Sequence, residues 1–572
     1  MPETLTSLGE RREQLFEELV KLGDFRPGTL SVNFRKCGRE NCACAKEEGH
    51  PGHGPQYLWS TTQKGKSRAQ NLRLGPEIKK VEREIETYRR FTELCGELVE
   101  VSEQICKLRP VEGTMDEREL SDLKKNLAEE VQQEVAKEIE ALLGRLTRQG
   151  NSLDLEASEM AIRTAVHEAG VIILEKLLGA IQEPLDDGVV TCEAGHECGL
   201  VDYRSKEIIS VLGPVKVRRG YYYCGECRQG VMPSDKQLDI VGTMYSPGVR
   251  RLMGLVGGKE SFEEGRRDLE ELAGIKVQTK AVERVAEGIG VQVEVAGQAE
   301  RIIAVQGNVV PIKSIPKMYV SMDGTGVPVI KRETEGRQGK AENGEAGTRE
   351  AKLGCVFTQT GLDEKGRPQR DSASTTYVGA IETAEEFGWR IYGEAERRGI
   401  RRSEQVVVIA DGAPWIWNIA DEHFPRSTQI VDLYHAREHL SDLSKVVYGT
   451  GSRKAKQWNT ELRTDLDEGK VENIIRRMRR LRPANEQIQD QVRKTINYFD
   501  NNKERMRYRK FREMGLFVGS GVIEAGCKTI TGQRLKRSGM KWSLRGANAI
   551  IALRCAQLSG RWEEFWAARV AG

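Results

Sequence analysis

Two short apolar runs in the second half of the chain each lead into an aspartate that is followed by glycine. Asp323 follows Met318-Tyr-Val-Ser-Met, and Asp411 follows Val406–Ala410. Short apolar runs bounded by turn residues are typical of buried strands. Strands that alternate with helical segments form mixed or parallel sheets. The region that contains both aspartates is therefore expected to fold as a mixed α/β sheet.

The surrounding sequence extends this pattern. Strands are expected at Lys317–Val320, Ala351–Thr358, Ser372–Val378 and Val406–Ala410. Between the last two, Glu382–Arg398 has helical periodicity, whereas Lys331–Arg349 is rich in Gly, Glu and Lys and is expected to be a mobile loop. Residues 436–515 are almost wholly helical in pattern. They are expected to form an insertion that follows the strands.

Composition limits the possible partners and compartments. The net charge is only +3 although 31% of the residues are charged, so any DNA-binding surface must be local. The first residues contain no apolar signal core, and the sequence has no apolar run of membrane-spanning length. A cytoplasmic protein is expected. In a reducing compartment, clusters among the 12 cysteines favour metal ligation over disulfides.

A third acid, Glu524, lies in Gly519-Ser-Gly-Val-Ile-Glu, just before a basic segment with helical pattern. Two carboxylates at strand ends and one on a helix supply the oxygen ligands that Mg²⁺ prefers. Two such ions about 3.5–4 Å apart stabilise both the entering and the leaving oxygen of a phosphodiester displacement. The alternative for either aspartate alone is an ordinary Asp-Gly turn. The combination of the three acids favours a two-magnesium site.

Two further polar residues follow the second acid. Asp432 and His435 stand one turn apart where a helix is expected to begin, in Asp432-Leu-Tyr-His. A purely structural explanation exists for each residue: Asp432 as a helix N-cap and His435 as a hydrogen-bonded core residue. Both alternatives stay open at this point.

These segments together resemble the catalytic domain of DDE transposases of the ISKra-type insertion-sequence family. The resemblance rests on Ser321-Met-Asp-Gly-Thr-Gly, Ala410-Asp-Gly-Ala-Pro-Trp, Asp432-Leu-Tyr-His and Gly519-Ser-Gly-Val-Ile-Glu-Ala-Gly-Cys-Lys. It implies an RNase H-like fold with a helical insertion before the glutamate. It also implies a triad of Asp323, Asp411 and Glu524 that holds two Mg²⁺ ions, with His435 orienting a ligand or the scissile phosphate.

The same resemblance implies that the partners are DNA, as element ends and target, and further copies of this chain on that DNA. A nucleoid-associated location follows from it. Some DDE groups place a basic residue two turns past the glutamate, where this chain has Thr531. Lys528 or Arg534 is then expected to contact DNA.

Taken together, these patterns predict a multidomain α+β protein with an RNase H-like mixed α/β catalytic domain. The expected regions are residues 1–110, an accessory domain with Cys, His and a long helix at Pro76–Leu108; 111–189, helical; 190–232, zinc-ribbon-like; 233–310, helix-turn-helix-like; 311–435, the catalytic core; 436–515, a helical insertion; and 516–572, which completes the core with Glu524 and basic helices.

Two cysteine pairs in residues 190–232 predict a structural zinc ribbon. Cys192-x₅-Cys198 precedes Cys224-x₂-Cys227, and the second pair has the spacing of a zinc knuckle. The first pair is looser, and His196 is a substitute ligand. The alternating sequence from Val211 to Tyr223 between the pairs predicts a hairpin. The resemblance supports four thiolate ligands, and free cysteines are the alternative.

A second group, Cys37-x₄-Cys42-x-Cys44 with His50 and His53 nearby, has irregular spacing. A metal site there is no better supported than free thiols, and only possible DNA or metal binding is assigned to it.

Residues 261–290 fit a helix, a Gly-containing turn and a second helix, as in a helix-turn-helix. The residues expected at the start of the reading helix are Gln278, Thr279, Lys280 and Arg284. An ordinary helical hairpin is the alternative.

Basic runs at Arg476–Arg482 and Arg534–Arg545 are expected to bind phosphates, or to be solvated faces. Trp542 is a candidate for stacking on unpaired bases. Core packing is favoured for Trp415 and Trp417.

These features predict a DNA transposase that cleaves element ends and joins 3′-hydroxyls to target DNA. Two alternatives remain. One is a domesticated, non-catalytic zinc-containing DNA-binding protein. The other is a metal-dependent nuclease that cleaves without joining strands.

Overall fold

The computed structural model describes residues 5–46, 49–63, 66–108, 117–146, 154–182, 190–307, 314–339 and 346–570. The chain divides into two compact units, Met1–Lys125 and Asn126–Gly572. Helix α4 (Glu117–Leu146) contains the boundary between them. No helix among these residues is both long and apolar enough to cross a lipid bilayer.

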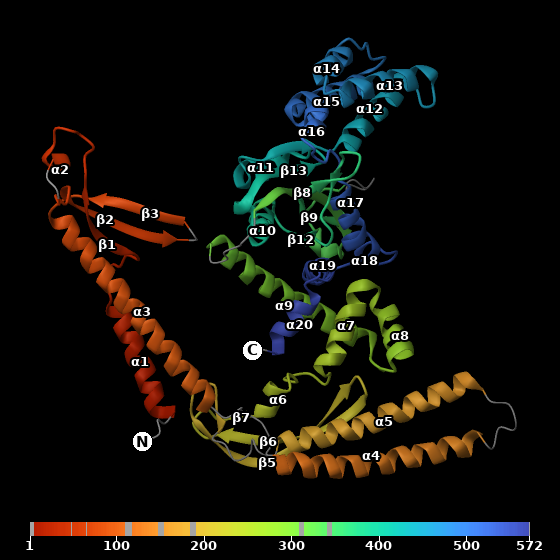
Figure 1. Ribbon diagram of the computed structural model, residues 1–572. Coiled ribbons are helices and arrows are strands. Elements are labelled where there is room, and N and C mark those ends of the chain that lie inside the picture. Colours follow the sequence, from red (N-terminus) through yellow and green to blue (C-terminus); the bar gives the residue numbers. More distant parts are fainter. Residues whose placement is uncertain are drawn as a thin grey trace. The chain divides into compact units, whose positions relative to one another are not determined.

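The first unit is a small antiparallel sheet with two long helices (Figure 1). Strands β1 (Thr29–Arg35), β2 (His53–Gln63) and β3 (Lys66–Leu72) lie in that order. Helix α3 (Pro76–Leu108) has the bounds that the sequence predicts, and α1 (Leu5–Lys21) packs against it. One face of α3 buries apolar side chains against the sheet, and this small core contains Leu72, Ile78, Val81, Ile85, Leu30, Tyr57 and Trp59.

The second unit begins with a helix that packs on a four-stranded antiparallel sheet. The sheet consists of β4 (Val190–Thr191), β5 (Glu197–Ser210), β6 (Gly213–Cys224) and β7 (Gln229–Val231) in sequence order. The β5–β6 hairpin predicted from the alternating sequence is present. Helix α5 (Leu155–Gln182) and this sheet share an apolar core. Side chains from the loop after α6 (Pro233–Gln237) also belong to that core.

Three helices connect this sheet to the large α/β region: α7 (Pro247–Lys259), α8 (Phe262–Ala273) and α9 (Thr279–Val305). A Ser261–Glu264 capping box begins α8, and Gly274 ends it with φ +69°. The order helix, turn, helix agrees with the prediction for residues 261–290. Helix α9 is 27 residues long and packs against α7, α10 (Ala384–Arg397) and α19 (Leu544–Leu558), so it is also part of the core.

A five-stranded mixed sheet forms the centre of the large region, as the sequence predicts. Its order is β12 (Thr376–Ala380), β9 (Thr348–Gln359), β8 (Ile315–Pro328), β13 (Ser403–Ala410) and β14 (Thr428–Val431). Strand β9 is antiparallel to β8 and β12, whereas β8, β13 and β14 are mutually parallel. The strands are buried on both faces, which explains their nearly continuous apolar runs.

Helices cover both faces of this sheet. A Cβ on Gly354 of β9 would meet Ile391 of α10, whereas a Cβ on Gly379 of β12 would meet Ile551 of α19. Gly354 pairs with Val378, so it shares a face with Val378, and the neighbouring Gly379 is on the opposite face. Helices α10 and α19 therefore pack on opposite faces.

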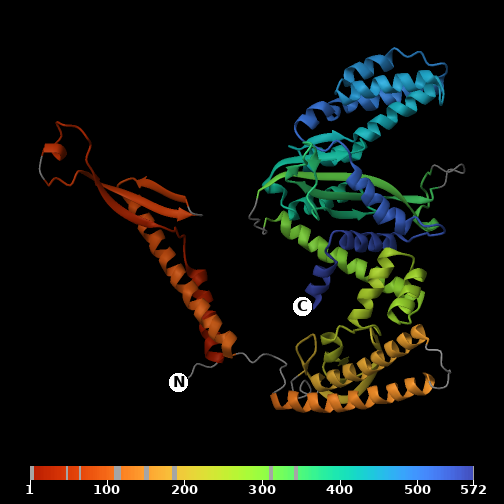
Figure 2. The same cartoon turned by 45° about the vertical axis from the view of Figure 1, so that its right-hand side comes forward.

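After β14 the chain forms a bundle of helices (Figure 2), in agreement with the predicted insertion. The bundle consists of α12 (Leu433–Tyr448), α13 (Arg453–Asp467), α14 (Val471–Arg479), α15 (Glu486–Asn501) and α16 (Tyr508–Glu513). The chain then returns to the sheet through the short helix α17 (Gly521–Cys527), a π-helical turn and α18 (Gln533–Leu535). Helix α20 (Trp562–Val570) follows α19.

Candidate active site

The first two acids lie on neighbouring parallel strands at the same edge of the sheet. The pairing of β8 with β13 ends at Ser321 and Ile409. Asp323 and Asp411 each lie two residues beyond those positions. Asp323 was expected to end its strand, but β8 continues to Pro328 as a hairpin with β9, and Asp323 pairs with Leu353. The strand continues because β9 supplies backbone partners that a sequence pattern does not reveal.

Asp411 lies in a tight turn that leads into α11 (Pro414–His423). Its Oδ1 accepts a hydrogen bond of 2.9 Å from the Ala413 N–H, as in an ordinary Asx turn. Gly412 has φ +105°, and a Cβ there would lie 2.8 Å from the ring of Tyr498. The Tyr498 hydroxyl donates to the Asp411 carbonyl at 2.9 Å. The second acid is thus fixed both by its own turn and by α15.

Glu524 reaches the same place from the short helix α17. Its side chain lines a pocket of about 430 Å³ together with Met322, Asp323, Asp411, Tyr434, His435, Glu438, Ser520 and Ile523. The Ser520 hydroxyl donates to Glu524 Oε1 at 3.1 Å. The structure therefore brings together the three acids and His435, all of which the sequence singles out. Glu438 adds a fourth carboxylate that the sequence analysis missed, although it stands three residues after His435 on the same helical face.

Asp432 connects the start of α12 to the segment that carries Glu524. It is 1% exposed, and its Oδ1 accepts from the His435 N–H at 2.6 Å as an N-cap. Its Oδ2 accepts from the Ser520 N–H. Next to it, the Leu433 N–H donates to the Val518 carbonyl at 2.9 Å. The N-cap interpretation is correct, and the same carboxylate also positions the residue that holds Glu524.

The His435 side chain faces the pocket and is 37% exposed. Its Nδ1 lies 3.8 Å from Glu438 Oε2, and its ring meets that of His439 edge-on at 4.8 Å between centroids. Burial and the neighbouring His435 lower the pKa of His439. His435 is therefore not a fully packed core residue, and it is free to meet a ligand in the pocket.

The described residues that line the pocket include four carboxylates, those of Asp323, Asp411, Glu438 and Glu524, and neither lysine nor arginine. Burial raises the pKa of Asp323, and the nearby carboxylates of Asp411 and Glu524 raise it further, against hydrogen bonds with Cys527 and Gly324. Burial raises the pKa of the Cys527 thiol, and the charge of Asp323 raises it further. Three acids that repel one another in a partly desolvated site favour the binding of cations.

Two of the expected DNA contacts are buried. Arg534 is 0% exposed, its Nε donates to the Gly257 carbonyl at 2.9 Å, and its guanidinium stacks on Phe262 and Trp542. Trp542 is 6% exposed and donates to the Leu535 carbonyl at 3.0 Å. Neither side chain is accessible to DNA in this structure. A planar guanidinium stacks well on aromatic rings, so a basic run can contain a core residue.

Other basic residues remain at the surface. Lys528, one turn after Glu524, is exposed, and the exposed Lys536 donates to the Thr325 hydroxyl beside the first acid. In the run Arg476–Arg482, Arg477 pairs with Glu461 and Arg479 with Asp500. Trp417 is buried and Trp415 packs against the core, as favoured from the sequence.

The predicted reading-helix residues lie at the start of α9. Gln278, Lys280 and Arg284 are exposed, but Lys280 pairs with Glu283 at 2.5 Å. The Thr279 hydroxyl donates to Glu263 of α8, so this residue joins the two helices. A role of this helix pair in reading DNA stays a prediction.

The Cys/His group of the four-stranded sheet lies at the end of its hairpin. Ligand atoms of Cys192, His196, Cys224 and Cys227 all lie within 4.8 Å of one another. Cys198 lies outside this group, and its Sγ is directed to the His196 carbonyl at 3.6 Å. The structure thus groups His196, the substitute ligand, in the place expected for Cys198.

The electrostatics of this group suit a metal ion. Burial raises the pKa of Cys192, but hydrogen bonds with the backbone of His196 and Ala194 outweigh it and lower that pKa to about 6. The hydrogen bond with Cys192 is the main cause that raises the pKa of Cys227 to about 12. Thiolates and an imidazole are the donor set of structural zinc sites, so the residues fit such an ion.

The chain is thus a multidomain mixed α/β protein with an acidic pocket at the edge of its main sheet and a Cys/His group able to hold a metal ion. Residues 146–566 match UPF0236, an uncharacterised protein family. Because this match covers most of the chain, the protein belongs to that family. Residues 5–83 match DUF6788, a domain of unknown function.

Individual relatives are distant. A UPF0236 protein in the vanSb 3′ region of Streptococcus gallolyticus is 22% identical over 374 residues, which cover 63% of this chain and 74% of that protein. The Drosophila P element transposase strand transfer complex is similar with 9% identity and a TM-score of 0.20, over 55% of this chain and 79% of that chain. A TM-score of 0.20 does not establish a shared fold.

Proposed function

We propose that this protein is a DNA transposase of an insertion sequence, of the ISKra-type DDE class. It cleaves the element ends and joins their 3′-hydroxyls to target DNA by two-metal phosphodiester transfer. The observation that carries the proposal is the convergence of Asp323, Asp411 and Glu524 on one pocket. These acids come from two neighbouring strands and a helix that is more than a hundred residues downstream in the sequence.

The donor set fits magnesium. Carboxylate oxygens are hard ligands. Burial and, after it, the nearby acids raise the pKa of Asp323, and bound cations would stabilise its ionised form. Asp323, Asp411 and Glu524 would hold the ions. When bound, two magnesium ions supply charge stabilisation for both the attacking and the leaving oxygen.

The other residues of the pocket position these acids and the substrate. Ser520 holds one oxygen of Glu524, and Asp432 holds the backbone of Ser520. Tyr498 fixes the backbone of Asp411. His435, which lines the pocket, would orient a scissile phosphate, and the exposed Lys528 and Lys536 would contact the DNA backbone.

Two finer assignments belong to this proposal. The catalytic region is RNase H-like: the mixed sheet with acids at adjacent strand ends, followed by helices before the glutamate, supports it. The Cys192/His196/Cys224/Cys227 group holds a structural zinc ion, with Cys198 as the alternative ligand. DNA and further copies of this chain on that DNA are the partners.

A strand-joining assay tests the function. Labelled DNA that carries the flanking repeats of the element is incubated with the full chain, Mg²⁺ and a supercoiled target. Nicked ends and joined products are expected from the unchanged protein. Glu524→Gln is expected to reduce both by about a hundred- to a thousandfold, as the loss of one charge-stabilising group does. The matched control is Glu422→Gln, an acid on α11 outside the pocket whose side chain is 62% exposed.

Each alternative function gives a distinct result. Nicked ends without joined product identify a metal-dependent nuclease. Specific DNA binding with no cleavage identifies a domesticated DNA-binding protein. Equal activity of Glu524→Gln and Glu422→Gln removes the acidic pocket from any catalytic role.

A further inference from the structure

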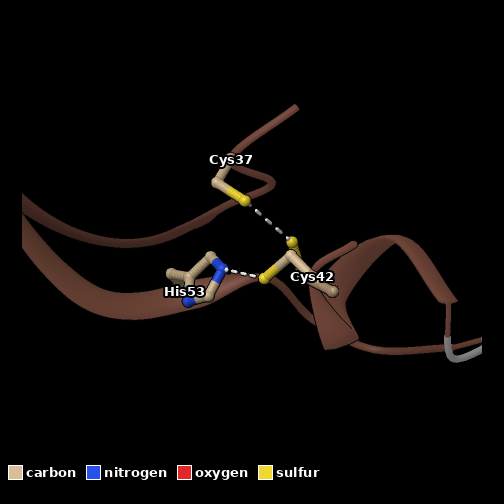
Figure 3. A group of neighbouring side chains, drawn as sticks. Cys37, Cys42 and His53 are labelled. Atoms are coloured by element: carbon tan, nitrogen blue, oxygen red, sulfur yellow. Dashed lines mark hydrogen bonds between the residues drawn. The ribbon is translucent and has the colours of Figure 1, made fainter. Parts of the chain in front are cut away.

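The first unit contains a second cluster of metal-ligating side chains, at the far end of the β1–β2 hairpin. Cys37 follows β1, and His53 begins β2. Cys42 directly precedes the short helix α2 (Ala43–Lys46), and Cys44 is the second residue of that helix. Ligand atoms of these four residues all lie within 4.8 Å of one another. Figure 3 shows Cys37, Cys42 and His53 converging from three separate stretches of backbone.

The distances are close to those around one tetrahedral ion. Zinc binds sulfur at about 2.3 Å and histidine nitrogen at about 2.0–2.1 Å, which separates neighbouring donors by roughly 3.3–3.8 Å. Cys37 Sγ and Cys44 Sγ are 3.5 Å apart. Cys42 Sγ and His53 Nε2 are 2.9 Å apart, the separation of a hydrogen bond. A bound ion takes the place of that proton, and the two atoms then move apart by less than about 1 Å.

The backbone of this segment is shaped for the cluster. A Cβ on Gly52, which has φ +105°, would lie 2.8 Å from the backbone of Arg35. Only glycine therefore allows the chain before His53 to approach β1 this closely. The register of β1 with β2 shifts between Asn33 and Arg35, and Arg35 pairs with His53. These two features turn His53 toward the cysteines.

No apolar core holds this segment. Among residues 36–46 and 49–53, the only side chain that is known to be buried is that of Cys44. The apolar core of the first unit lies elsewhere, around Trp59 and Val81. A loop with so little buried apolar surface needs another source of order, which a metal ion provides in small domains.

We propose that Cys37, Cys42, Cys44 and His53 form a structural zinc site that orders residues 36–46 and 49–53. The donor set of three thiolates and one imidazole is closed, so the ion has no open position for chemistry. Binding of the ion releases the thiol protons. The site is independent of the acidic pocket and of the proposed activity.

Zinc content of the full chain, purified without chelator, tests the proposal. Two zinc ions per chain are expected, one for each Cys/His group. Cys42→Ser is expected to lower the content by one, and Cys42→Ser with Cys224→Ser by two. Cys95→Ser is the matched control: this cysteine is on α3, half-buried and outside both groups, so the content should not change.

A second variant separates loss of the ion from loss of folding. His53→Cys keeps four soft ligands, so it should retain the zinc that Cys42→Ser loses. In cobalt-substituted protein it should also increase the thiolate-to-metal absorption. Trypsin cleavage after Arg39 and Lys46, both exposed, should accelerate in Cys42→Ser but not in His53→Cys. Equal zinc content in Cys42→Ser and Cys95→Ser, with equal cleavage rates, overturns the proposal.

Discussion

The carboxylate of Asp432 joins two segments that are far apart in the sequence. One oxygen caps α12 and the other holds the Ser520 N–H, from which Glu524 is positioned. Asp432 and Asp323 differ in the groups that surround their carboxylates. Asp432 is surrounded by backbone donors, whereas Asp323 faces other carboxylates. The first arrangement stabilises the fold and the second opposes it.

Removal of the Asp432 carboxylate is expected to destabilise the second unit. Asp432→Ala leaves one buried and one partly buried N–H group without this acceptor, at about 1–3 kcal/mol each, so a loss of about 2–6 kcal/mol is expected in urea unfolding. Asp442→Ala, on the same helix but exposed and paired with the exposed Lys445, should change stability by less than about 0.5 kcal/mol. Similar losses from both variants would contradict the bridging role.

Neutralisation of Asp323 is expected to stabilise the protein while it removes activity. Because the pKa of Asp323 is raised by burial and by the other acids, its ionised form lowers stability above that pKa. Asp323→Asn should therefore melt at a higher temperature than the unchanged chain at pH 7 in chelator. The gain should disappear as the pH falls through this raised pKa, because the unchanged chain then takes up the proton itself.

Asp363 provides the control of opposite sign. Hydrogen bonds with the Arg367 backbone are the main cause that lowers the pKa of Asp363. Asp363→Asn should lower the melting temperature at pH 7, and this loss should vanish as the pH falls through that lowered pKa. A melting temperature of Asp323→Asn at or below that of the unchanged chain would show that the charge is already compensated.

At the scale of elements, helix α9 connects the parts of the second unit. It packs against α7, α10 and α19, and its close approach to α19 depends on one residue. A Cβ on Gly290 would lie 2.1 Å from the Ala549 carbonyl oxygen. The two helices touch backbone to backbone at this point, where no side chain has room.

A methyl group at this contact is expected to be costly. Gly290→Ala must move two packed helices apart, and overpacking of this kind typically costs about 1–3 kcal/mol. Gly288→Ala, two residues earlier on α9, meets nothing within 4 Å and should instead stabilise by about 0.5–1 kcal/mol. Thermal unfolding of both variants tests this contact. Stability changes in the same direction for the two substitutions would contradict it.

Sequence patterns located most of these elements because their apolar periodicity is set by burial. Pro76–Leu108, the strands of the main sheet and the helices after β14 follow this pattern, and so the acids at adjacent strand ends were expected to meet. Patterns could not show where β8 ends, since its outer half depends on pairing with β9. Nor could they show that Arg534 is stacked between aromatic rings, or that His196 stands closer to the thiols than Cys198. Those outcomes depend on contacts between distant segments.

At the scale of the whole molecule, the chain has two compact units, each with its own cluster of Cys and His side chains. The first unit has only a small apolar core around α3, whereas the second has an extensive core around the mixed sheet. Units with separate cores commonly unfold in separate transitions.

Calorimetry of the full chain is therefore expected to show at least two transitions. Cys42→Ser should lower the transition temperature of the first unit by several degrees and leave that of the second unit unchanged. The reason is that an ion that binds only the folded state of one unit stabilises only the unit to which it binds. Cys224→Ser should lower the transition temperature of the second unit and leave that of the first unit unchanged. A single transition that both variants shift equally would show that the two units unfold together.

The helices between β14 and Glu524 leave the sheet and return to it at nearly the same point. Leu433 is hydrogen-bonded to Val518, and the Tyr508 hydroxyl donates to the Val431 carbonyl at 3.1 Å. When the two ends of a segment lie next to each other, residues can be inserted into it or deleted from it at little cost in loop-closure entropy. Natural variation in length within this family should accumulate between residues 449 and 507, while the spacing of the acids to their own strands and helix stays fixed.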